Sequence, residues 1–350
     1  MLYDAILNGL LSVYDYLSLH VLACLVPAFF IAGAVAVFVS KQSVIRYFSS
    51  KTKKFVSYSI ASVSGTVLAV CSCTILPLFA GIYKRGAGIG PATTFLYSGP
   101  AINILAIIYT AKVLGFELGA ARAVLAIFMS ILIGIAMASL FKDHDLINRT
   151  NTQFEMNEGS GRPQWILFLL FVFLVLILVI GTMNLSLTTR LGMIALLILG
   201  VAVLLKYHFT VEEIRDWGYE TWDLTKKIFP ILIIGTFAVG VIAYYLPPET
   251  FRAFLGGNSL ISCFTASVIG ALLYMPTLLE VPIIGTTFGY STGIMGGGPA
   301  LSLLLSGPSV SLPSMLVLHR IMGTKKTTAF IILVVLVSTL AGFAYGKVVG

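Results

Sequence analysis

The stretch WILFLLFVFLVLILVI (165–180) decides the class of fold, because it contains no polar side chain. A helix that crosses the apolar core of a bilayer needs about 20 predominantly apolar residues. The rest of the 350-residue chain continues in the same way: 58% of it is hydrophobic, 10% is charged, and the mean hydropathy is +0.99. A soluble domain carries about 25% charged residues. We therefore predict an all-α polytopic membrane protein.

Further apolar segments define the expected spans. They fall at about 17–39, 55–71, 74–83, 88–110, 123–141, 165–183, 191–205, 228–246, 259–275, 277–290, 298–318 and 327–346. The segments 74–83 and 277–290 are too short or too rich in glycine for ordinary spans. We expect about ten full spans and two short crossing segments.

The net charge of +8 fits basic cytoplasmic loops better than a nucleic-acid surface. No basic patch with interleaved aromatic residues occurs outside the apolar segments. The four cysteines, Cys24, Cys71, Cys73 and Cys263, all fall in apolar segments without zinc-finger spacing. The expected partners are the lipid bilayer and a small solute, with no nucleic acid. Neither a disulfide framework nor a resident cofactor is predicted.

Two parts of the chain resemble each other. ASVSGTVLAVCSCTILP (61–77) matches ASVIGALLYMPTLLEVP (266–282), and GPATTFLYSGPAINIL (90–105) matches GPALSLLLSGPSVSLP (298–313). The matches occur in the same order and keep proline and glycine in register, which indicates an internal repeat.

The repeat divides the chain into three parts: a first transmembrane repeat at 12–141, a linker at 142–222 with two transmembrane helices and cytoplasmic loops, and a second transmembrane repeat at 223–348. If the two short segments cross the membrane, the repeats are inverted and 17 of the 22 Lys and Arg residues lie on one side. These occupy 41–54, 84–85, 142–164, 206–227 and 319–326. Parallel repeats would place 12 inside and 10 outside. Because basic residues gather in cytoplasmic loops, we predict inverted repeats with both termini outside.

Helix-breaking residues recur at matching positions. Pro77 corresponds to Pro282, and Ser-Gly-Pro at 98–100 corresponds to Ser-Gly-Pro at 306–308. Proline lacks the N–H that a helix interior needs, and paired broken helices are typical of the central site of a secondary transporter. The alternative is that these small residues only allow helices to pack closely.

Cys71 and Cys73 are candidate ligands for a soft metalloid or thiophilic metal. In an ideal helix their side chains would point about 200° apart. They could hold one ligand only if the backbone unwinds there, which Pro77 permits. The alternative is that both thiols pack as small hydrophobic groups.

Glu280 is the only one of 14 acidic residues that lies well inside an apolar segment. An intramembrane carboxylate is costly and by default marks a proton or substrate path, so we predict proton coupling at Glu280. The alternative is a buried carboxylate that pairs with a hydroxyl or reaches the interface. The full set of candidate substrate-binding and translocation residues is Cys71, Cys73, Pro77, Ser98, Gly99, Pro100, Asn103, Thr277, Glu280, Pro282, Ser306, Gly307 and Pro308.

The block CSCTILPLFAGIYKRGAGIGPATTFLYSGPAINILAI (71–107), with the later GPALSLLLSGP (298–308), resembles the ArsP-type predicted permease family, which includes the YraQ-like proteins. The resemblance implies a multi-pass permease of the prokaryotic inner membrane. Characterised members export trivalent organoarsenicals, and others are linked to metal resistance. The positions that carry a similar block in the family are Cys71, Cys73, Pro77, Gly81, Arg85, Gly86, Pro100 and Asn103.

The resulting prediction is a permease, not an enzyme, that performs proton-coupled efflux of a soft metalloid or trivalent organoarsenical. No Gly-x-x-x-x-Gly-Lys-Ser/Thr phosphate loop is present, which favours secondary transport. One alternative is a membrane thiol-disulfide oxidoreductase that relays electrons through Cys71 and Cys73 to a soluble thiol protein. Another is a channel or permease for a non-metal solute. The sequence is compatible with a homo-oligomer.

Overall fold

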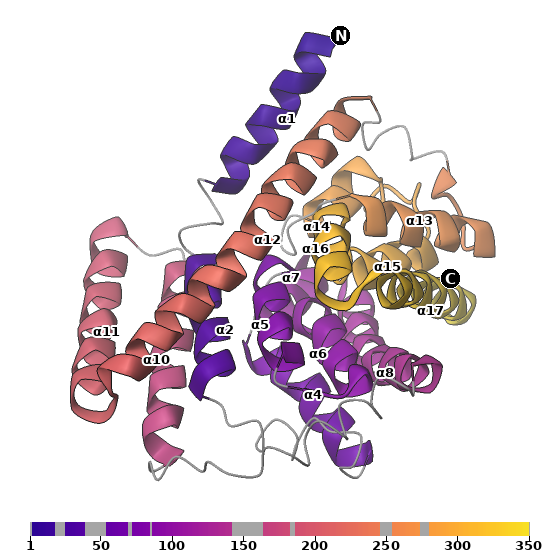
Figure 1. Ribbon diagram of the computed structural model, residues 1–350. Coiled ribbons are helices and arrows are strands. Elements are labelled where there is room, and N and C mark those ends of the chain that lie inside the picture. The colour runs from indigo at the N-terminus through magenta and orange to yellow at the C-terminus, as the bar shows by residue number, and fades with distance from the viewer. Residues whose placement is uncertain are drawn as a thin grey trace.

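The computed structural model describes residues 2–17, 25–38, 54–68, 72–84, 86–141, 164–182, 186–245, 254–273 and 280–349. Within these ranges the chain forms helices joined by turns and short irregular segments, and it contains no strand (Figure 1). The predicted class is confirmed: the chain is an all-α polytopic membrane protein.

The helices fall into three successive groups along the chain. The first group is α1 (Leu2–Tyr16), α2 (Val26–Phe38), α4 (Lys54–Leu68), α5 (Ser72–Lys84), α6 (Ile89–Ala101), α7 (Ile104–Val113) and α8 (Phe116–Leu140). The second group is α10 (Gln164–Thr182), α11 (Leu187–His208) and α12 (Val211–Tyr245). The third group is α13 (Leu260–Leu272), α14 (Glu280–Pro282), the π-type turn η3 (Ile283–Thr287), α15 (Gly297–Ser306), α16 (Leu312–Met322) and α17 (Thr324–Val348).

Few of the described helices are long and apolar enough to cross a bilayer unaided. Three meet that test, Phe116–Leu140, Thr188–His208 and Thr324–Val348. A fourth results if α6 and α7, which bend by 44° at their junction, form one broken span. Other apolar helices have 10–17 residues, less than the roughly 20 that a straight crossing needs. The number of spans therefore stays a prediction.

The same packing order occurs in the first and third groups. In the first group α4 packs on α6 and α6 packs on α8, while in the third group α13 packs on α15 and α15 packs on α17. The two groups meet where α8 contacts α15 and α17. The long α12 runs diagonally across the molecule, beside α1 at one end and near α2, α10 and α11 at the other (Figure 1).

Glycines allow the closest helix contacts in both groups. A Cβ on Gly134 of α8 would lie 2.8 Å from the carbonyl oxygen of Gly90 in α6. A Cβ on Gly342 of α17 would overlap the carbonyl oxygen of Gly298 in α15. The spacing from 90 to 298 equals that from 134 to 342, and it is the offset at which 90–105 matches 298–313. Equivalent positions therefore make equivalent contacts, as small residues do between membrane helices.

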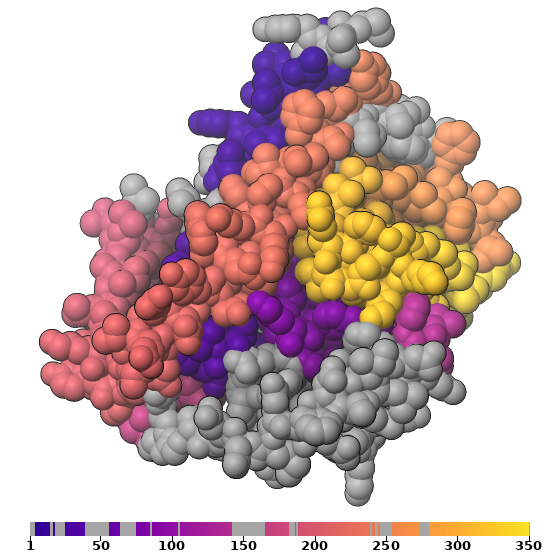
Figure 2. Space-filling view, viewed as in Figure 1, coloured from indigo at the N-terminus to yellow at the C-terminus, as the bar shows by residue number. Residues whose placement is uncertain are grey.

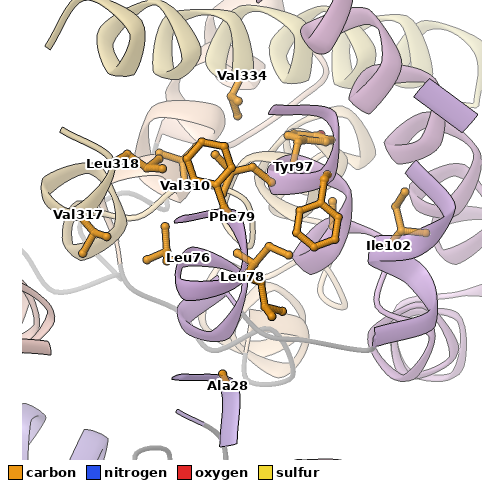
Figure 3. Packing of buried hydrophobic residues seen from close by; sticks show 14 of the residues in the cluster. Ala28, Leu76, Leu78, Phe79, Tyr97, Ile102, Val310, Val317, Leu318 and Val334 are labelled. Carbon is orange, nitrogen blue, oxygen red and sulfur yellow. The ribbon is translucent and has the colours of Figure 1, made fainter. Parts of the chain in front are cut away.

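Part of the buried core lies where the first and third groups meet. Leu76 and Phe79 of α5 belong to the same buried cluster as Tyr97 of α6, Val317 of α16 and Val334 of α17. Figure 3 shows these side chains converging from the four helices. Apolar contacts from several sides therefore hold α5, α6, α16 and α17 against one another.

The predicted breaks take different forms in the structure. α5 continues through Pro77, so the unwinding expected there is absent from 72–84. One reason is that residues 75–82 are all buried, and packing holds the helix despite the missing N–H of proline. At Pro282 the chain changes to the wider turn Ile283–Thr287. α6 ends one residue after Pro100, and α15 ends immediately before Gly307.

Candidate functional site

Glu280, the first residue of α14, forms an ion pair inside the protein. Its side chain is 0% exposed, and its Oε1 lies 2.6 Å from Nη2 of Arg122, which is also 0% exposed. Arg122 lies in the second turn of α8, which begins after Gly115. The pair therefore joins a helix of the first group to a helix of the third.

A third polar residue supports the arginine. Nη1 of Arg122 donates a hydrogen bond to Oγ1 of Thr110 in α7 at 2.9 Å. The Thr110 hydroxyl in turn donates to the carbonyl oxygen of Ala106 at 2.7 Å. Removing two charges from water costs several kcal/mol per ion unless other groups compensate. The hydroxyl supplies part of that compensation for Arg122.

The compensation is incomplete. Within the described ranges, Nε of Arg122 and Oε2 of Glu280 have no hydrogen-bond partner. The 2.6 Å contact between Nη2 and Oε1 is a short ion pair that lacks hydrogen-bond alignment. Buried polar atoms in native structures nearly always have partners. Nε of Arg122 could therefore still donate a hydrogen bond, and Oε2 of Glu280 could still accept one.

Glu280 also lies against the second Ser-Gly-Pro break. A Cβ on Gly307 would be 3.5 Å from Oε2 of Glu280. The carboxylate therefore lies directly beside the backbone of this break. Gly270 of α13 approaches the same point, since a Cβ there would lie 3.0 Å from the Gly307 nitrogen. The structure therefore brings together Glu280 and the predicted set at 306–308.

The two Ser-Gly-Pro breaks are neighbours in space. Oγ of Ser309, just after the second break, lies 3.5 Å from the carbonyl oxygen of Tyr97, just before the first. Ser98 donates a hydrogen bond to the carbonyl oxygen of Ala61 in α4 at 3.1 Å. All four of these residues are buried. The breaks thus meet at the contact between the two groups of helices.

Asn103 occupies the junction of α6 and α7 and is 7% exposed. Its carbonyl oxygen accepts a hydrogen bond from the Ile107 N–H at 3.0 Å, in the first turn of α7. The corresponding residue of the second match, Ser311, forms a capping box with Ser314 at the start of α16. Both residues therefore begin the helix that follows a break.

The structure does not place the thiols of Cys71 and Cys73 relative to the Arg122–Glu280 ion pair. Cys71 and Thr277 lie outside the described residues, and of Cys73 only the backbone, in α5, is described. Cys263 is buried in α13, where its sulfur would be 3.1 Å from a Cβ on Gly298, so it packs between helices. In the part of the chain that is described, no three His, Cys, Asp or Glu residues gather as a metal site does.

Arg122 is the main residue that the sequence analysis did not identify. The apolar segment was predicted to begin at 123, which placed Arg122 at a span edge, whereas α8 begins at Phe116. A signal was available, since an intramembrane carboxylate usually has a partner inside the bundle. Several Lys and Arg residues were candidates, and nothing in their spacing selects one.

Comparison with known proteins identifies the family of the chain. The family model ArsP_1, described as a predicted permease, matches residues 6–347. The UPF0718 protein MJ0584 of Methanocaldococcus jannaschii is 44% identical over 347 residues, 96% of this chain and 94% of that protein. The UPF0718 protein YraQ of Escherichia coli is 23% identical over 73% of this chain and 58% of its own length. No solved structure matches the chain. Its sequence and its helical membrane architecture together place the chain in the ArsP_1 family of predicted permeases.

Proposed function

We propose that this permease is a secondary transporter whose coupling element is the Arg122–Glu280 ion pair. The observation that carries the proposal is the complete burial of both charges, each 0% exposed. Charged residues inside membrane helices are expensive and by default serve a proton or substrate path. The pair joins α8 to α14, so a change in it alters the contact between the two groups of helices.

Coupling follows from the chemistry of the carboxylate. Charged Glu280 holds α14 against Arg122, whereas a proton on Glu280 removes its charge and weakens the attraction. α14 can then move relative to α8, the kind of motion between repeats that alternating access requires. The π-type turn Ile283–Thr287 directly follows α14, and such turns occur frequently at functional sites. Return of Glu280 to Arg122 releases the proton.

The proposed substrate is a soft metalloid or trivalent organoarsenical, moved outward across a prokaryotic inner membrane. Two lines of reasoning support it: thiolates suit soft ligands, and the block around Cys71 and Cys73 resembles the ArsP-type family. We further propose two inverted repeats, 12–141 and 223–348, joined by the linker 142–222. The recurrent glycine contacts at Gly134 and Gly342 support this division.

Uptake of a trivalent organoarsenical into everted membrane vesicles tests the substrate. The wild type is expected to accumulate it when a proton gradient is applied. The Cys71→Ser/Cys73→Ser variant is expected to lose about 90% of that uptake, because hydroxyls are poor ligands for soft elements. Cys263→Ala is the matched control, since Cys263 packs away from the break residues at 306–308, and it should retain uptake.

Other outcomes reject specific parts of the proposal. Uptake that survives in the double serine variant would leave a transporter whose cysteines only pack. Substrate-dependent oxidation of Cys71 without uptake would instead favour the thiol oxidoreductase. No uptake by either protein would reject the organoarsenical as substrate, and the role of Glu280 would then be tested with other solutes.

A further inference from the structure

A cavity of about 670 Å³ lies at the junction of α5, α12 and α16. Its wall is apolar and includes Ala80, Leu224, Ile228, Ile231 and Ile321. Around this wall stand four cationic residues and one acid: Lys84, Lys226, Lys227, Arg320 and Asp223. On the face drawn in Figure 2, α12 meets the yellow C-terminal helices, and purple residues of the first group emerge beside the junction.

Two of the four cations are already neutralised. Nζ of Lys84 lies 2.6 Å from Glu220 and 3.5 Å from Asp223. Lys227 pairs with the same Asp223 at 2.7 Å. These contacts are on exposed side chains and orient the lysines rather than stabilise the fold. The net positive charge of the cavity therefore comes from the two remaining cations.

Lys226 and Arg320 carry that surplus positive charge. Nζ of Lys226 lies 5.5 Å from the centre of the Trp222 ring, a contact that leaves its charge uncompensated. Arg320, in the last turn of α16, forms no ion pair with any carboxylate in the described ranges. The cavity thus combines an apolar wall with two uncompensated cations.

Part of the cavity wall belongs to α5, the helix that contains Cys73. Ala80, Tyr83 and Lys84 lie on α5, which begins at Ser72 beside the cysteine pair. Cys73 and Lys84 are about 16 Å apart along the axis of such a helix. All four cations of the cavity fall in segments predicted to face the cytoplasm. A solute entering from that side would meet the C-terminal end of α5 in this cavity.

We propose that this cavity is a cytoplasmic vestibule that binds an amphiphilic organic anion, with an apolar body and one anionic group. The proposal rests on the proposed function and narrows its solute to organoarsenicals whose organic part carries an anionic group. The apolar wall takes the body, because burial of carbon surface is favourable. Lys226 and Arg320 take the anionic group. The headgroup of an anionic phospholipid shares this chemistry, and the experiment must separate the two sources.

Binding of tritiated 4-phenylbutyrate to the purified full chain in nanodiscs of zwitterionic lipid tests the proposal, with empty nanodiscs as the blank. Saturable binding is expected, and 4-phenylbutylamine, the cation of the same shape, should not compete. Lys226→Gln/Arg320→Gln should weaken binding about tenfold, because two attractive charges are lost next to a partly apolar wall. Higher salt should also weaken it.

The variants are chosen so that folding does not obscure the result. Neither Lys226 nor Arg320 pairs with a carboxylate in the described ranges, so their removal leaves no acid unpaired and should preserve the melting temperature. Lys325→Gln is the matched control, an exposed cation at the same end of the molecule that does not line the cavity. It should bind the probe like the wild type.

Three results would overturn the proposal. The first is absence of saturable binding, and the second is equal binding by the wild type and the double glutamine variant. The third is loss of probe binding when phosphatidylglycerol is added to the nanodiscs at a fixed probe concentration, which would assign the site to a lipid headgroup. No transport is measured, so failure here is distinct from failure of coupling at Glu280 or of the thiols.

Discussion

Replacing Glu280 with Gln is expected to abolish transport driven by a pH gradient and to lower the free energy of unfolding by about 3–5 kcal/mol. The substitution leaves Arg122 buried without its counter-ion, 2.6 Å from a neutral amide in place of a carboxylate. A guanidinium stays protonated in proteins and cannot escape the cost by losing its charge. Transport would stop because Gln cannot bind and release a proton.

Arg122→Gln should destabilise the protein less than Glu280→Gln. A buried carboxylate left without its partner can neutralise itself by taking up a proton, which the guanidinium cannot do. Arg122→Gln/Glu280→Gln removes both charges and should recover most of the lost stability, since neutral replacements of buried ion pairs are often tolerated. Transport should remain absent in the double variant.

Denaturation in mixed micelles and pH-driven counterflow in proteoliposomes measure these two properties. Glu117→Gln is the control, because Glu117 is an exposed carboxylate in the first turn of α8 and should change stability by no more than about 1 kcal/mol. Wild-type transport by Glu280→Gln would remove the proton-coupling proposal. A double variant less stable than both single variants would show that the pair itself stabilises the fold.

Gly342→Ala is expected to cost about 1–3 kcal/mol of stability, the range for overpacking a tight contact. The new Cβ would lie 3.0 Å from Cβ of Ser302 and would overlap the Gly298 carbonyl oxygen. Backbone cannot turn aside as a flexible side chain can, so α15 and α17 must separate. Gly134→Ala should have a similar effect in the first group, because it meets Gly90 in the same way.

Gly192→Ala is the matched control for both glycine variants. A Cβ at Gly192 in α11 would meet nothing within 4 Å, and alanine is the better helix former by about 1 kcal/mol. Stability should therefore be unchanged or slightly higher. Thermal unfolding of the four proteins in one detergent makes the comparison. If Gly342→Ala and Gly192→Ala behaved alike, the close contact between α15 and α17 would be wrong.

Some features of the site could be read from single residues. Glu280 was identifiable because the cost of a carboxylate among apolar residues is local and large. The breaks near Pro100 and Gly307 were identifiable because Ser-Gly-Pro recurs at matching positions. Pro77 shows the limit of such reasoning. It stands inside a continuous helix, since contacts from other helices decide whether a proline ends a helix or only weakens it.

The sequence by itself determined that the chain is a helical membrane protein, because composition averaged over whole segments decides whether they favour lipid, and in lipid a helix satisfies its own backbone groups. Its similarity to known sequences places it in the predicted permease family. The sequence also determined which carboxylate is buried. Only the tertiary structure decided that Arg122 is the partner of Glu280 and that Lys226 and Arg320 share a cavity with α5. These are contacts between residues far apart in the chain. They depend on which faces of the packed helices meet, and a local sequence pattern does not contain that information.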